Sequence, residues 1–183
     1  MSLPAKIAFF SYLLVAIAAF VAAWHAKARH NRANHGGNWV AIFLAFIGLA
    51  SVRIFDWEQA MRESLRTALR SAMDYGDRAN LQAPLVVVVL LVAVAAALLA
   101  RRYWRNTPSV RERYLRIAQF ATLAFVPLFA LRLISLHVVD TLLYAAPFKL
   151  NWVVDGLLTG VVGLSAALYI RRVQRSSGGI SQA

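Results

Sequence analysis

The stretch PLVVVVLLVAVAAALLA (residues 84–100) consists of apolar residues alone and approaches the length of about 20 residues that a membrane-spanning helix needs. The whole chain of 183 residues has the same character. It is 60% hydrophobic and 15% charged, with a mean hydropathy of +0.58, whereas soluble domains carry about a quarter charged residues. We therefore predict an all-α integral membrane protein, with residues 1–183 forming a single helical membrane domain.

Four other segments have the length and apolar composition of a span, so five transmembrane helices are expected. Together the predicted spans cover residues 3–24, 39–56, 84–100, 117–136 and 152–170. Residues 26–28 (AKA) match a signal-peptidase pattern after the first span. The apolar run is longer than a signal core, however, and the stronger positive charge follows it rather than precedes it. The first span is therefore interpreted as a retained helix.

The distribution of charge predicts the orientation. Residues 25–37, 101–116 and 171–183 together contain 12 basic residues and 1 acidic residue, whereas 53–79 and 137–151 are balanced. Because basic loops stay on the cytoplasmic side, the N-terminus is expected outside and the C-terminus inside. Arginine outnumbers lysine 17 to 3, as is typical of GC-rich bacterial genomes. We therefore expect a bacterial inner (cytoplasmic) membrane protein with a periplasmic N-terminus and a cytoplasmic C-terminus.

The same rule accounts for the arginine-rich run RRYWRNTPSVRERYLR (101–116). Such a run is also typical of nucleic-acid binding, but its place in the alternation favours a cytoplasmic loop, so no nucleic-acid partner is expected. Its charges should attract anionic lipid headgroups.

The connection between the second and third spans has an amphipathic pattern. EQAMRESLRTALRSAMDYG (58–76) places apolar side chains on one helical face and arginines at intervals of four on another. We expect an interfacial helix at about 58–75, ending near the capping residue Gly76. Packing on a partner protein or over the outer ends of the spans is equally compatible with this pattern.

Two pairs of segments suggest a tandem repeat of helices 2–3 and 4–5. AFIGLASVRIFDW (45–57) aligns with AFVPLFALRLISL (124–136), which matches Arg53 to Arg132. AAALLARRYWR (95–105) aligns with SAALYIRRVQR (165–175). Both halves would run from inside to outside and back, as in the parallel repeats of some transporters.

Four ionisable residues near the outer ends of the spans form a predicted intramembrane ionic network. Arg132 and Asp155 stand about one turn below the ends of neighbouring spans, and we expect them to pair. Arg53 lies at a similar depth and has Asp56 at i+3 on its own helix. Pro127 should kink the fourth span below Arg132.

Beyond Arg132, the residues His137, Asp140 and Tyr144 share one face if the helix continues. These four residues are the candidate ligand site suggested by the sequence. Near the interface, however, ionisable groups also form purely structural networks, and both interpretations remain open.

No catalytic residue, metal site or resident cofactor is predicted. His25 and His137 lie at opposite membrane surfaces, about 30 Å apart, so they cannot hold one haem. Ser135 and His137 are two residues apart and point to different helix faces, which does not suit a catalytic triad. The chain has no cysteine, which excludes disulfides and thiolate metal sites. Enzyme activity is therefore not favoured, and a bound lipid, quinone or pigment is the type of ligand left open.

The fifth span contains a helix-packing pattern. Gly156, Gly160 and Gly163 place small residues at close intervals, which allows close helix contact in lipid. We favour packing within the bundle over dimerisation.

Three classes of function fit these features. The favoured one is a small accessory or assembly subunit that docks to a larger membrane protein complex, since catalytic motifs and sizeable soluble domains are absent from the sequence. The second is a small transporter or channel that uses the outer Arg/Asp network. The third is a lipid- or quinone-binding protein at the outer interface. The expected partners are membrane lipids and other membrane proteins.

Overall fold

The protein is described by a computed structural model. It covers residues 3–28, 34–55, 109–133 and 150–178, with single positions at 57, 60, 61, 63, 64, 67, 87, 91, 94, 95, 98, 101 and 102. Regular structure within these residues is helical throughout. Three helices are long and apolar enough to cross a membrane, at Ala5–Lys27, His35–Ile54 and Trp152–Arg175. The fold is thus all-helical over the described residues, with three candidate membrane-spanning helices, and is compatible with a multi-pass membrane protein.

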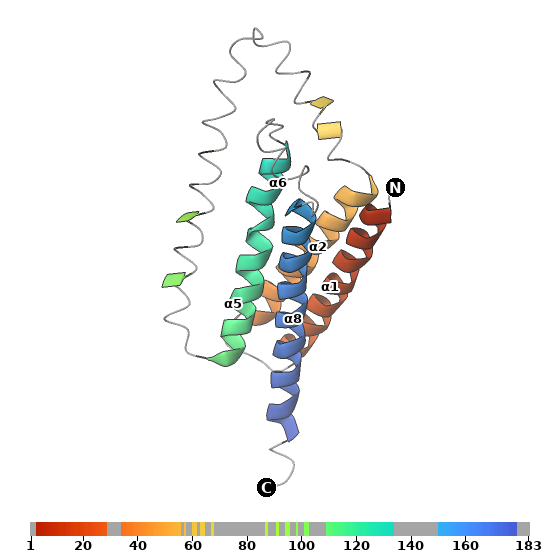
Figure 1. Ribbon diagram of the computed structural model, residues 1–183. Helices are drawn as coiled ribbons and strands as arrows, with labels where there is room; N and C mark the ends of the chain where they lie inside the picture. The colour runs from red at the N-terminus through yellow and green to blue at the C-terminus, as the bar shows by residue number, and fades with distance from the viewer. Residues whose placement is uncertain are drawn as a thin grey trace.

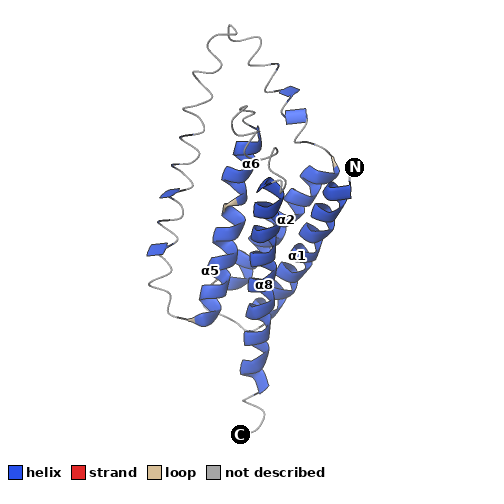
Figure 2. Cartoon of the chain, in the orientation of Figure 1, coloured by secondary structure: helices blue, strands red, loops and turns tan. Residues whose placement is uncertain are grey.

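Four helical rods pack side by side (Figures 1 and 2). They are α1 (Leu3–Lys27), α2 (His35–Ile54), α5 (Val110–Leu123) continued by α6 (Phe125–Leu133), and α8 (Leu150–Gly178). Contacts join α1 to α2, α2 to α5, α5 to α8, and α8 back to α1, so the rods form a closed ring around a shared core. The N-terminus lies at the same end as α6 and the start of α8 (Figure 1).

Helix α2 begins four residues before the predicted start of its span because a polar cap extends it. The side chain of Asn34 accepts a hydrogen bond from the backbone N–H of Gly37 at 3.3 Å, which satisfies an N–H that the helix itself leaves unpaired. A Cβ on Gly36 would lie 3.7 Å from Cβ of Lys27, so the end of α1 and the start of α2 approach closely.

The predicted fourth span is divided in two. Helix α5 starts at Val110, where Ser109 caps it by accepting from the N–H of Glu112 at 3.2 Å. It ends at Leu123, four residues before Pro127, and α6 begins at Phe125. Proline lacks an N–H, and its ring crowds the carbonyl four residues back, which is the carbonyl of Leu123. The interruption expected from Pro127 therefore falls one turn before the proline itself.

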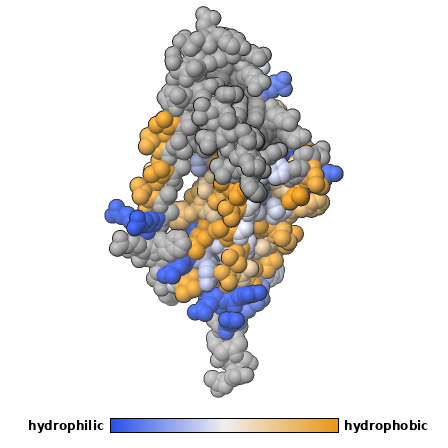
Figure 3. Space-filling model, viewed as in Figure 1, coloured by the Kyte–Doolittle hydropathy of each residue, from blue (hydrophilic) through white to orange (hydrophobic). Residues whose placement is uncertain are grey.

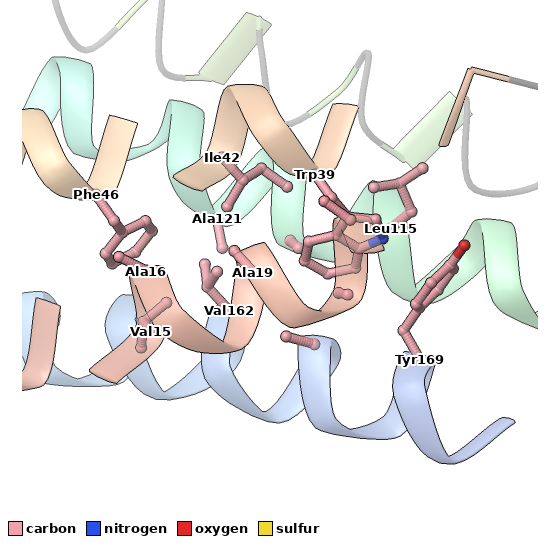
Figure 4. Close-up of a cluster of buried hydrophobic side chains, with 14 of the residues drawn as sticks. Val15, Ala16, Ala19, Trp39, Ile42, Phe46, Leu115, Ala121, Val162 and Tyr169 are labelled. Carbon is pink, nitrogen blue, oxygen red and sulfur yellow. The ribbon is translucent and has the colours of Figure 1, made fainter. Parts of the chain in front are cut away.

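The core combines a few large side chains with many small ones (Figure 4). The largest fully buried side chains are Trp39, Tyr12, Tyr169, Phe46 and Val162. Helix α1 contributes a buried face made largely of alanine, namely Ala16, Ala19, Ala22, Ala23 and Ala26. Small residues at a helix interface let the backbones approach closely, which is the usual way that helices pack in lipid.

The outer surface of the bundle carries many large apolar side chains (Figure 3). Exposed examples are Phe10, Leu14 and Phe20 on α1 and Leu157 and Leu164 on α8. A monomer in water rarely exposes so much contiguous apolar surface. Large apolar residues on the outside of the bundle therefore suit a lipid environment.

Several sequence predictions fall largely outside the described residues. The described positions within 58–75 and within 84–100 are helical, but the remaining positions of both segments are not described. The amphipathic helix, the third span, the count of five spans and the tandem repeat therefore stay predictions.

The three glycines of the fifth span have different surroundings. A Cβ on Gly163 would lie 3.3 Å from Cγ2 of Val15, so α8 and α1 make close contact there. At Gly156 and Gly160 a Cβ would meet no described atom within 4 Å, and both residues are exposed. Packing within the described bundle therefore involves Gly163 but not the other two.

Candidate functional site

The candidate site is built around Asp155, a buried carboxylate one and a half turns into α8. Its Oδ1 accepts a hydrogen bond from the hydroxyl of Tyr12 on α1 at 2.5 Å. Its Oδ2 lies 3.1 Å from Nη2 of Arg53 on α2, in a hydrogen-bonded ion pair. The three side chains come from three helices, so the network joins α1, α2 and α8 at one end of the bundle.

Burial makes this network energetically important. The side chain of Asp155 is 9% exposed and that of Arg53 is 22% exposed. A lone carboxylate buried among apolar helices would lose several kcal/mol of hydration, and an oppositely charged, hydrogen-bonding partner offsets that loss. Arg53 also lies in the last turn of α2, where the helix dipole favours a cation.

An aromatic cluster packs against the inner side of the network. The rings of Tyr12, Phe46 and Phe125 lie in edge-to-face geometry, with centroids 5.9, 6.0 and 5.6 Å apart. These three rings are buried and belong to α1, α2 and α6. The two phenylalanine rings pack around the Tyr12 ring and hold it in place, so its hydroxyl is positioned to donate to Asp155.

A cavity of about 240 Å³ lies beside the ion pair, between α1, α2 and α8. Arg53 and Asp155 form its polar part, and small residues such as Ala8, Ser11 and Gly156 form much of its wall. These small side chains leave space where larger ones would fill it.

Two hydroxyl groups add hydrogen-bond acceptors to the cavity wall. Ser11 donates to the carbonyl of Ala8 at 2.8 Å, and Thr159 donates to the carbonyl of Asp155 at 2.7 Å. Because their protons are used within their own helices, each oxygen presents lone pairs. The cavity can thus hold a polar group of modest size next to a charged pair.

The structure brings together two of the four residues of the predicted ionic network, Arg53 and Asp155. Arg132 belongs to α6, but its side chain is outside the described residues, as is Asp56. The predicted pairings of Arg132 with Asp155 and of Arg53 with Asp56 therefore stay predictions. The described contact joins Asp155 to Arg53, a pairing between spans two and five that the sequence did not suggest.

The ligand site predicted from the sequence, which begins at Arg132, stays a prediction. His137, Asp140 and Tyr144 lie outside the described residues. Conversely, Tyr12 was missed by sequence reasoning. Its one signal is a hydroxyl within the mostly apolar span at 3–24, which the neighbouring Ser11 also has.

A second polar cluster lies at the opposite end of the bundle. Nδ1 of His35 on α2 lies 3.3 Å from the hydroxyl of Tyr169 on α8, and the Trp39 ring packs 5.2 Å from the Tyr169 ring. Nε1 of Trp39 is buried without a hydrogen-bond partner among the described residues. On α5, Glu112 pairs with Arg116. This cluster links the first turn of α2 to the late turns of α8.

Within the described parts of the chain, no three histidine, aspartate or glutamate side chains are grouped as a metal site would require. The described residues form an all-helical bundle with three candidate membrane-spanning helices and a buried ion pair beside a cavity. Comparison with known protein families, curated proteins and solved structures found no match.

Proposed function

We propose that this chain is a multi-pass membrane protein that binds an amphiphilic molecule, a lipid or a quinone, in the cavity beside Arg53 and Asp155. The observation that carries the proposal is the cavity of about 240 Å³ next to a buried ion pair. Its rim includes Ile7 and Trp152, whose apolar side chains are exposed. A polar head would lie by the ion pair, and an apolar tail would lie along the outer surface of the helices.

The chemistry of the wall favours a head group with acceptor oxygens. Arginine is the residue best suited to carbonyl, carboxylate and phosphate oxygens because its guanidinium presents five donors in a planar fork. Quinone carbonyls and lipid phosphates or esters share that chemistry. A purely structural ion pair would gain from dense packing around it, whereas Ala8, Ser11 and Gly156 leave the adjoining volume open.

The proposed topology has five spans, with the N-terminus periplasmic and the C-terminus cytoplasmic in a bacterial inner membrane. The ion pair would then lie in the outer half of the bilayer. Since the chain has no cysteine, single-cysteine variants can test this directly. Ser2→Cys should react in intact cells with a membrane-impermeant thiol reagent, and Ser181→Cys should react only after the cells are opened. The reverse pattern would contradict the topology.

Ligand retention tests the binding site with a matched pair of variants. Gly156→Leu adds bulk to the cavity wall while keeping Arg53 and Asp155 themselves, and a Cβ there meets nothing within 4 Å, so the helix should fold. Gly160→Leu adds the same side chain one turn away, also in open space and away from the cavity. We expect Gly156→Leu to lower the amount of co-purified ligand by about tenfold, equivalent to about 1.4 kcal/mol of binding free energy.

The measurement is mass spectrometry of lipids and quinones extracted from protein isolated in native nanodiscs. A redox-active isoprenoid would identify a quinone, and a phosphorus-containing species would identify a phospholipid. Equal retention by the Gly156→Leu and Gly160→Leu variants would remove the proposal. The accessory-subunit and transporter hypotheses remain predictions from the sequence, and the cavity favours neither of them.

A further inference from the structure

The end of the bundle opposite the ion pair carries a cluster of exposed basic side chains. We call it the basic rim. It consists of Lys27 on α1, Arg113 on α5, and Arg171, Arg172 and Arg175 on α8, all of which are exposed. These residues come from the sequence segments 25–37, 101–116 and 171–183. The single acidic residue of those segments is Glu112, which pairs with Arg116. The rim therefore has a strong net positive charge.

Helix α8 directs several of these charges away from the core. Tyr169 and Val173, four residues apart, are buried against the bundle. Arg171 and Arg175 are also four residues apart and lie on the opposite face of the helix. The helix continues to Gly178, past the ends of its neighbours (Figure 1), so it carries these guanidinium groups beyond the apolar part of the bundle.

The basic rim directly borders the apolar outer surface. On α1, Trp24 is exposed one turn before Lys27, and Phe20 is exposed two turns before it. On α8, Leu164 is exposed two turns before Arg171. Figure 3 shows blue side chains gathered at this end of the molecule, next to the orange apolar surface. Positive charge at the edge of an apolar surface matches a molecule that has an anionic head and an apolar tail.

We propose that the basic rim binds anionic phospholipids, with their phosphates on the arginines and their acyl chains on the adjoining apolar surface of α1 and α8. Guanidinium groups bind phosphate oxygens in a bidentate manner, and each basic residue near an anionic membrane surface strengthens association by about fivefold. A nucleic acid would use the charges but leave the apolar border uncovered. The rim lies at the other end of the bundle from the cavity and does not depend on the proposed ligand site.

The test compares two variants that remove equal charge. The rim variant is Arg171→Gln with Arg172→Gln and Arg175→Gln. The control is Arg62→Gln with Arg66→Gln and Arg70→Gln, which also removes three positive charges but in the segment expected on the other side of the membrane. Both proteins are reconstituted in nanodiscs of equal parts phosphatidylcholine and phosphatidylglycerol, and the lipids that stay bound after brief detergent extraction are quantified by native mass spectrometry.

We expect the native chain and the control to retain more phosphatidylglycerol than phosphatidylcholine, and the rim variant to retain the two lipids equally. Added salt should weaken the enrichment in the native chain, because the interaction depends on charge. Inorganic phosphate at equal ionic strength should weaken it no more than chloride does. The proposal would be overturned if the rim variant still retained more phosphatidylglycerol than phosphatidylcholine, or if the control lost this preference to the same extent. Co-purification of nucleic acid in place of phosphatidylglycerol would also overturn it. A thermal unfolding temperature equal to that of the native chain would show that the fold of the rim variant is intact.

Discussion

Replacing Trp39 with alanine should lower the free energy of unfolding by about 4 kcal/mol, since large-to-small changes of a fully buried aromatic residue cost about 3–5 kcal/mol. Trp39 is 0% exposed and lies where α2, α5 and α8 meet, with its ring 5.2 Å from that of Tyr169. The neighbouring face of α1 consists mostly of alanine, whose short side chains cannot extend into the space. Equilibrium unfolding in mixtures of sodium dodecyl sulfate and a mild detergent would measure the change.

Trp24 supplies the matched control for this prediction. It is also a tryptophan near the same end of the bundle, but it is 69% exposed. Trp24→Ala should change the free energy of unfolding by less than about 1 kcal/mol, as is usual for surface positions. An equal loss of unfolding free energy in the two variants would contradict the burial of Trp39 in the core.

Replacing Asp155 with asparagine should lower the free energy of unfolding by about 3 kcal/mol, because it removes the negative charge that lies 3.1 Å from the mostly buried guanidinium of Arg53. Asparagine has nearly the same shape as aspartate and can still accept a hydrogen bond from Tyr12, so the loss should come mainly from the charge. The same detergent-mixture titration measures it.

A double-mutant cycle identifies the partner of Asp155. Arg53→Gln should be clearly less destabilising when Asp155 is already asparagine than when it is aspartate. The parallel cycle with Arg132→Gln tests the pairing predicted from sequence. Additive effects in the Arg53 cycle would contradict the ion pair.

The helices themselves were largely predictable from the sequence. The predicted first, second and fifth spans appear as α1, α2 and α8, because apolar runs of this length have no other stable form in lipid. Their ends were less predictable. Asn34 adds a first turn to α2 through a side-chain cap, and α8 continues through Arg171 to Gly178 because arginine favours helix as well as apolar residues do.

The candidate site was predictable only in part. The position of Asp155 within an apolar span, with an arginine at the same depth in another span, could be recognised as unusual from the sequence. Which arginine faces which carboxylate depends on the order of the helices around the ring and on the rotation of each helix, and a hydropathy pattern contains neither. For the same reason Tyr12, 143 residues away from Asp155 along the chain, could not be assigned to the network.

The order of the three network residues along the chain has a consequence for biogenesis. Tyr12 and Arg53 belong to the first two described helices, which are synthesised before α8, the helix that contains Asp155. Until α8 leaves the ribosome and inserts, the guanidinium of Arg53 has no access to this carboxylate. Closure of the network therefore requires that α8 has docked against α1 and α2 in its correct register, so this ion pair forms late in the assembly of the bundle.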